Sequence, residues 1–149
     1  MAAATAGPVT AARVAGLWLV SLTQRTGTLT GQGYWYLTPS CDTGACSAKM
    51  ERPTRSAAGQ PVIVVTSTAA YNGTAYSGQD KSSASCVAAG GAVGDKATTT
   101  NTYTFQVSKA ALTSSGWTAT EIVGTFLIHS DTGDCRDALY DVKGAPQPQ

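Results

Sequence analysis

The sequence has few charged residues, a single histidine and no long apolar run. Charged side chains make up 13% of the 149 residues, and ten basic residues against nine acidic ones leave a net charge of +1. The basic residues stand singly, apart from the near pair Arg52 and Arg55. Nucleic-acid binding requires a basic patch, so we expect no nucleic-acid partner. No window approaches the roughly 18 apolar residues of a membrane-spanning helix, so we expect no direct membrane insertion.

The rest of the composition is that of a globular domain. Hydrophobic residues make up 42% of the chain, whereas disordered chains combine low hydrophobicity with high net charge. Residues 1–12 are rich in Ala and Thr and lack the apolar core of a signal peptide. We expect them to be a disordered linker left after removal of a signal peptide. We expect a single domain over residues 13–143 and a disordered tail over residues 144–149, which are rich in Pro, Gly and Gln.

Four cysteines indicate two disulfides and an oxidising compartment. Cys41 and Cys46 enclose four residues, which suits facing positions on a short hairpin, and the remaining pair is Cys86 with Cys135. A zinc site would need short paired spacings or more histidines than His129, so we expect no metal and no cofactor. Disulfides form in secreted proteins, and we therefore expect a secreted, extracellular location.

Short strands account for most of the chain. The expected strands are residues 14–23, 33–39, 47–51, 61–71, 74–79, 98–107, 117–129 and 135–143. Asn72-Gly73 is a strong hairpin signal, because tight hairpin turns require residues that tolerate positive φ. Two segments between strands are expected to be irregular: Asp80–Lys96 as a long loop, and residues 108–116 with one helical turn.

This pattern predicts an all-β fold: an antiparallel, up-and-down barrel of about eight strands, with a β-sandwich as the alternative. No stretch has the periodicity of a long amphipathic helix, which excludes folds that need crossover helices. In an up-and-down order, the connections that carry Cys86 and Cys135 fall at the same end of the sheet. This placement agrees with their pairing.

The Gly16-Leu17-Trp18 segment at the start of the first strand resembles the Gly-x-Trp opening of lipocalin-like (calycin) barrels. The resemblance implies an eight-stranded barrel that holds a small apolar or aromatic ligand inside. It also implies a basic residue over the tryptophan, near the end of the last strand. Arg136 is at the start of that strand, and Lys143 is nearer but stacks less well than arginine. The run around Cys41 and Cys46 also resembles uncharacterised disulfide-containing extracellular domains of actinobacteria, which implies location more than function.

No group of residues predicts catalysis, and we expect the protein not to be an enzyme. Asp-Thr-Gly occurs at Asp42 and again at Asp131, and two such triplets could suggest an aspartic protease. Their flanking residues are polar or cysteine rather than apolar, and Asp and Gly are also the residues that tight turns select. His129, Ser130 and Asp131 are sequence neighbours whose side chains point apart, so they do not form a triad.

The aromatic residues are the remaining functional signal. Five of them are the candidate ligand-binding residues: Tyr34, Trp35, Tyr36, Tyr76 and Tyr103. Adjacent residues of a strand point to opposite faces, so Tyr34 and Trp35 cannot both enter one core. We expect a secreted, non-catalytic binding or sensing module that recognises a small or carbohydrate-like ligand through these rings. The alternative is a structural surface or assembly protein that uses its sheet face for contacts with another surface protein.

Overall fold

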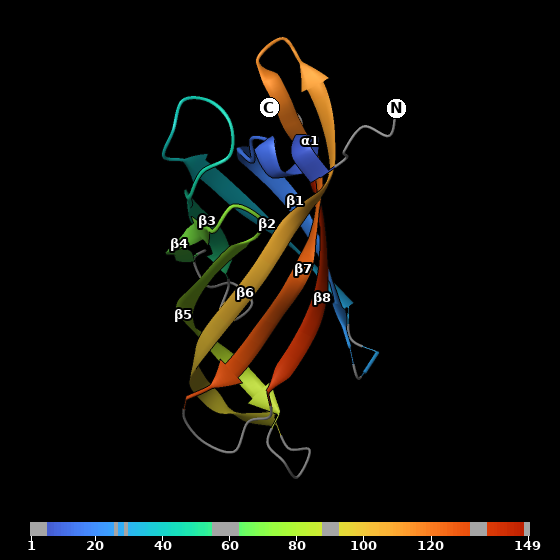
Figure 1. Cartoon of the computed structure of the whole chain (residues 1–149). Coiled ribbons are helices and arrows are strands. Elements are labelled where there is room, and N and C mark those ends of the chain that lie inside the picture. Colours follow the sequence, from blue (N-terminus) through green and yellow to red (C-terminus); the bar gives the residue numbers. More distant parts are fainter. Residues whose placement is uncertain are drawn as a thin grey trace.

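The computed structural model shows a closed antiparallel β-barrel in which the eight strands follow one another around the wall in chain order (Figure 1). It describes residues 6–25, 27–28, 30–54, 63–87, 93–131 and 137–147. The elements are α1 (Ala6–Ala11), β1 (Gly16–Gln24), β2 (Thr30–Pro39), β3 (Ala48–Thr54), β4 (Ile63–Tyr71), β5 (Tyr76–Val87), β6 (Val93–Thr113), β7 (Gly116–Ser130) and β8 (Ala138–Pro146).

The predicted fold class is confirmed. β8 pairs with β1 from Trp18↔Pro146 to Gln24↔Tyr140, and this pairing closes the sheet on itself. The up-and-down barrel is therefore correct, and the sandwich alternative is wrong. Closure leaves no outermost strand, which is how small β-domains avoid exposing a full strand edge.

Residues Asp80–Lys96 do not form the long loop that we expected. β5 continues to Val87 and pairs with β6 from Tyr76↔Phe105 to Val87↔Val93. The residues of this stretch are small and polar, so they carry no apolar alternation. The described residues nevertheless form strands, because Asp80–Ser85 and Val87 each have a partner across the β5–β6 hairpin.

The helical turn expected at residues 108–116 is also absent. β6 runs on to Thr113 and pairs with β7 as far as Thr113↔Gly116, with two residues in the turn. Gly116 adopts φ 108°, a conformation that residues with a side chain rarely adopt. The hairpin predicted near Asn72-Gly73 is present, with Gly73 at φ 99° and the Asn72 amide bonded to the Ala75 carbonyl.

The two chain ends take part in the fold further than we expected. Within residues 1–12, Ala6–Ala11 form α1, and Ala12 is fully buried. α1 lies at the end of the barrel where β1 begins (Figure 1), and the Tyr71 hydroxyl donates to the Thr10 carbonyl at 2.5 Å. At the other end of the chain, residues 144–146 extend β8 and pair with β1. Ala12 contributes an apolar contact, and residues 144–146 contribute ladder pairs with β1. Neither contribution is visible from the composition of the two segments.

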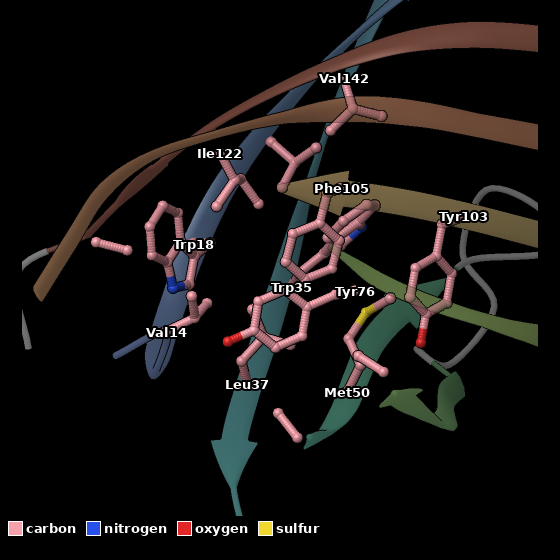
Figure 2. Packing of buried hydrophobic residues seen from close by; sticks show 14 of the residues in the cluster. Val14, Trp18, Trp35, Leu37, Met50, Tyr76, Tyr103, Phe105, Ile122 and Val142 are labelled. Carbon is pink, nitrogen blue, oxygen red and sulfur yellow. The ribbon is translucent and has the colours of Figure 1, made fainter. Parts of the chain in front are cut away.

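The core fills the barrel interior, and Figure 2 shows its close packing. Every second residue of each strand faces inward, so the buried set alternates along the chain. Its largest fully buried members are Trp18, Tyr76, Tyr103, Phe105, Leu37, Met50 and Ile122.

Candidate functional site

β2 presents its three consecutive aromatic rings to opposite sides of the barrel wall. The Trp35 side chain is 3% exposed and points into the core, whereas Tyr34 and Tyr36 are 47% and 43% exposed on the outside. Pairing Trp18↔Trp35 places the two tryptophan residues next to each other on the inner face. The question of which ring enters the core is thus answered in favour of Trp35.

The inward rings pack against each other. The Trp35 ring centroid lies 5.7 Å from that of Tyr103, 5.8 Å from that of Phe105 and 6.1 Å from that of Phe126. Tyr76 stacks on Phe105 with centroids 4.9 Å apart and planes 8° apart. Three of the five predicted ligand-binding residues, Trp35, Tyr76 and Tyr103, are therefore core residues in contact with other rings.

Burial changes the titration of two of these tyrosines. The pKa of Tyr76 is raised to about 12, mainly by desolvation and in smaller part by the neighbouring Tyr71, while Arg13 opposes the shift. Desolvation also raises the pKa of Tyr103, partly offset by its hydrogen bond with Ser67, whose oxygen lies 2.7 Å from the Tyr103 hydroxyl. Both rings are held neutral as packing groups.

A buried polar network lies in the same interior. Arg52 donates to both carboxylate oxygens of Asp80, from Nε at 2.8 Å and from Nη2 at 2.7 Å, and Asn101 Nδ2 donates to the same carboxylate at 2.8 Å. The Arg52 guanidinium also lies 5.1 Å from the Phe126 ring centroid, within cation–π range. This network connects β3, β5 and β6 across the barrel, and its charges are paired as burial requires.

Sequence reasoning missed this network, although strand alternation contains a signal for it. Asn101 has the same parity in β6 as Tyr103 and Phe105, and Asp80 has the same parity in β5 as Tyr76. Extending the apolar alternation by one or two steps would have placed both polar residues inside. The assignment of Asp80 to a loop prevented that step.

The outside of β1, β2 and the end of β3 carries an apolar surface, which we call the outer tyrosine face: Leu17, Leu19, Tyr34, Tyr36 and Pro53. Tyr36 pairs with Leu17 and Tyr34 with Leu19 across the β1–β2 ladder. An open hollow on this surface is lined by Leu17, Tyr34, Pro53 and Gln147. It combines an aromatic ring, two apolar side chains and one amide. Of the five candidate residues, only Tyr34 and Tyr36 lie here.

The Cys41–Cys46 disulfide closes the connection between β2 and β3, as predicted, with Cα atoms 6.2 Å apart. The Cys41 amide also donates to Cys46 Sγ at 3.1 Å. The predicted Cys86–Cys135 pairing lies outside what the structure describes, because the side chain of Cys86 and all of Cys135 are not described. β5 and β7, which lead toward these two cysteines, end on the same side of the barrel.

The residues that could suggest catalysis do not assemble. Asp42 lies between β2 and β3, whereas Asp131 follows β7 at the opposite end of the barrel, so the two carboxylates of a protease dyad do not meet. A hydrogen bond from Thr100 is the main cause that lowers the pKa of Asp131, and Lys81, 3.2 Å away, contributes. His129 Nδ1 lies 2.7 Å from Asp137 Oδ1 on the exposed surface. These contacts are surface hydrogen bonds and a surface ion pair between Lys81 and Asp131.

The sequence raises the question of two other kinds of site: a metal site and a basic residue over Trp18. Within the described part of the chain, no three His, Cys, Asp or Glu residues gather as metal ligands. Trp18 is buried, and its indole N–H donates to the Ala15 carbonyl at 3.2 Å. Lys143 does not cover it, because its ammonium lies 3.6 Å from Glu121 on the outer surface, and Arg136 falls outside the described residues.

Comparisons with known proteins give no assignment. No protein-family model, no curated protein and no solved structure matches the chain. Among the described residues, no helix is both long and apolar enough to cross a membrane.

Proposed function

We propose that the protein is a secreted, non-catalytic binding module that recognises a carbohydrate-like ligand on the outer tyrosine face. The observation that carries the proposal is the split of the β2 aromatics. Trp35 is used by the core, while Tyr34 and Tyr36 remain about half exposed on one face of the same strand. A buried ring stabilises the fold, whereas an exposed ring on a rigid strand is available to a ligand.

The neighbours of these rings suit a neutral sugar. Tyr34 and Tyr36 lie two positions apart on β2, so about 7 Å separates their attachment points, comparable to successive units of an oligosaccharide. The hollow beside Tyr34 adds the amide of Gln147 to an apolar floor of Leu17 and Pro53. Apolar surface with a few fixed polar groups is typical of small-ligand sites.

Two further parts of the proposal concern location and covalent structure. The Cys41–Cys46 disulfide is compatible with an oxidising compartment, and it supports the proposed secretion. We include a second bridge, Cys86–Cys135, on the pairing argument from the sequence. The relation to lipocalin-like barrels stays a prediction, and the packed interior rings favour a ligand outside the barrel over one inside it.

The test is a binding screen with soluble neutral oligosaccharides of cellulose, chitin and mannan, followed by calorimetric titration of any that bind. We expect Tyr36→Ser to weaken binding roughly tenfold, the loss of one stacking contact. Trp117→Ser is the matched control, because Trp117 is 37% exposed but lies away from this face, at the β6–β7 turn. Equal affinity of the two variants, or no binding by the wild type, would refute the carbohydrate proposal.

The second candidate is a surface-assembly protein. It is favoured by one feature of β2: pairing with β3 ends at Tyr36↔Glu51, although β2 continues to Thr30.

A further inference from the structure

Part of β2, on the side that faces β3, has no strand partner among the residues that the structure describes. β2 pairs with β1 along Thr30–Leu37, but the described pairing with β3 covers only Tyr36↔Glu51 to Pro39↔Ala48. We call residues 30–34 of β2 the free edge. Among the described residues, none pairs with the β3 side of this segment.

Strand geometry shows which backbone groups face the gap. The Ser40 amide donates to the Ser47 carbonyl at 3.0 Å, so in this register the even-numbered residues of β2 bond toward β3. The other side of β2 gives the same result. The Arg25 amide donates to the Leu139 carbonyl, so the odd-numbered residues of β1 bond toward β8. The even-numbered residues of β1 therefore bond toward β2, where their partners are odd-numbered. The N–H and C=O groups of Thr30, Gln32 and Tyr34 thus point into the gap.

Pro53 explains why the ladder stops where it does. Continuing the β2–β3 register by two residues would place Tyr34 opposite Pro53, as a hydrogen-bonded pair. Proline has no N–H, so it cannot donate to the Tyr34 carbonyl. Instead, Tyr34 and Pro53 line a common open hollow.

The free edge lacks the features that protect strand edges. Natural edges carry lysine, proline or a bulge, whereas residues 26–40 contain no charged residue and the β1–β2 register has no bulge. At Gly31 and Gly33, which face inward, a Cβ atom would meet nothing within 4 Å. Glycine in a strand often marks a place where another backbone approaches closely.

We propose that the free edge pairs antiparallel with the same segment of a second copy of this chain. A two-fold axis at Gln32 would place Gln32 opposite its own copy and Thr30 opposite Tyr34, while the glycines would face each other on the inner side. The two amides can bond to each other, and a ring beside a threonine is a favourable cross-strand pair. The segment is uncharged, so no like charges oppose the pairing, and two-fold dimers are the commonest oligomers.

This dimer extends the proposed function without depending on it. A two-fold axis perpendicular to the shared sheet places both outer tyrosine faces on one side. Two adjacent sites on a rigid dimer would bind a polymeric glycan more tightly than one site does, through effective concentration. The pairing itself uses main-chain groups, so it would form whether or not the face binds a sugar.

The test measures molar mass against protein concentration by sedimentation equilibrium. We expect the wild type to approach twice the monomer mass at high concentration. Gln32→Pro removes the N–H that faces the gap and no ladder bond to β1, so it should weaken dimerisation roughly tenfold or more. Gln32→Thr keeps the N–H and is the matched control, which should dimerise like the wild type. A wild type that stays monomeric at millimolar concentration, or a Gln32→Pro dimer of unchanged affinity, would overturn the proposal.

Amide hydrogen exchange gives a second readout that needs no variant. The amides of Gln32 and Tyr34 should exchange fast in dilute protein and slowly in concentrated protein, while those of Gly31 and Gly33 stay protected throughout by β1. Protection of Gln32 and Tyr34 that is the same at both concentrations would show that the edge is already satisfied within one chain, and would refute the dimer. Tyr36→Ser separates the two proposals, because it removes a sugar contact and leaves the edge intact.

Discussion

The inner and outer sides of β2 use the same kind of side chain for different purposes. Trp35 makes ring contacts with Tyr103, Phe105 and Phe126 and is excluded from water. Tyr34 and Tyr36, one position away on either side, are about half exposed. An aromatic residue therefore indicates function only when its face of the strand is known. The outer pair lies outside the buried core.

The interior is filled by its own side chains, unlike that of a barrel that holds a ligand inside. A barrel that encloses a ligand keeps its inner side chains apart, whereas here Tyr76 and Phe105 stack with centroids 4.9 Å apart. The polar interior groups are likewise occupied, since both Arg52 and Asn101 donate to the Asp80 carboxylate. The contrast between a filled inside and an open outside leads to the following expectations.

The largest effect should come from truncating the inner ring. We expect Trp35→Ala to lower the free energy of unfolding by about 3–5 kcal/mol, through lost burial and the cavity left among its neighbours. Tyr34→Ala should change it by no more than about 0.5 kcal/mol, as is usual for an exposed position. Urea denaturation measures both values. Similar losses of unfolding free energy in the two variants would contradict the conclusion that only the inner ring stabilises the fold.

A comparable test applies to Asp80 and its outward neighbour Lys81. Asp80→Ala leaves the Arg52 guanidinium, whose side chain is 13% exposed, without its carboxylate, and we expect a loss of about 3 kcal/mol. Lys81→Ala removes an exposed ammonium that bonds to Asp131 and Thr100, and should cost less than about 1 kcal/mol. If the Asp80 variant were as stable as the Lys81 variant, the buried network would not contribute to the fold.

Alkaline pH should destabilise the protein through its buried tyrosines. An unfolded tyrosine ionises near pH 10, whereas the pKa of Tyr76 is raised to about 12 in the fold, mainly by desolvation. The unfolded state therefore releases its proton first, and stability is lost as the pH rises from about 10 to 12. The linkage amounts to about 3 kcal/mol at most, and Tyr76→Phe should reduce the slope of stability against pH. An unchanged slope in this variant would contradict the burial of Tyr76.

The smallest effect on stability is expected from the outer face itself. The double variant Tyr34→Ser/Tyr36→Ser should unfold within about 1 kcal/mol of the wild type while losing ligand affinity. A large loss of stability would show that these rings serve the fold. Thermal unfolding followed by circular dichroism is sufficient to decide.

The sequence allowed the barrel to be predicted but not its inner face. The strand count, the hairpin turns and the Cys41–Cys46 disulfide can be predicted from residues that are close together in the sequence. Alternation along β2 shows that Trp35 opposes Tyr34 and Tyr36, but with aromatic residues on both faces it does not say which face is buried. Asp80 escaped prediction because the small, polar residues after it were assigned to a loop, and its partner Asn101, 21 residues away on another strand, gives no local signal of the contact. Contacts at that range depend on the register between strands, which no single segment encodes.

The central claim is that recognition takes place on the outside of β1 and β2. The most direct measurement is an amide chemical-shift titration of the labelled protein with the oligosaccharide that binds best in the screen. The proposal predicts shifts concentrated at Leu17, Tyr34 and Tyr36, with the interior unchanged. Shifts concentrated instead at Asp80, Asn101 and Tyr103 would place the ligand inside the barrel and contradict the claim.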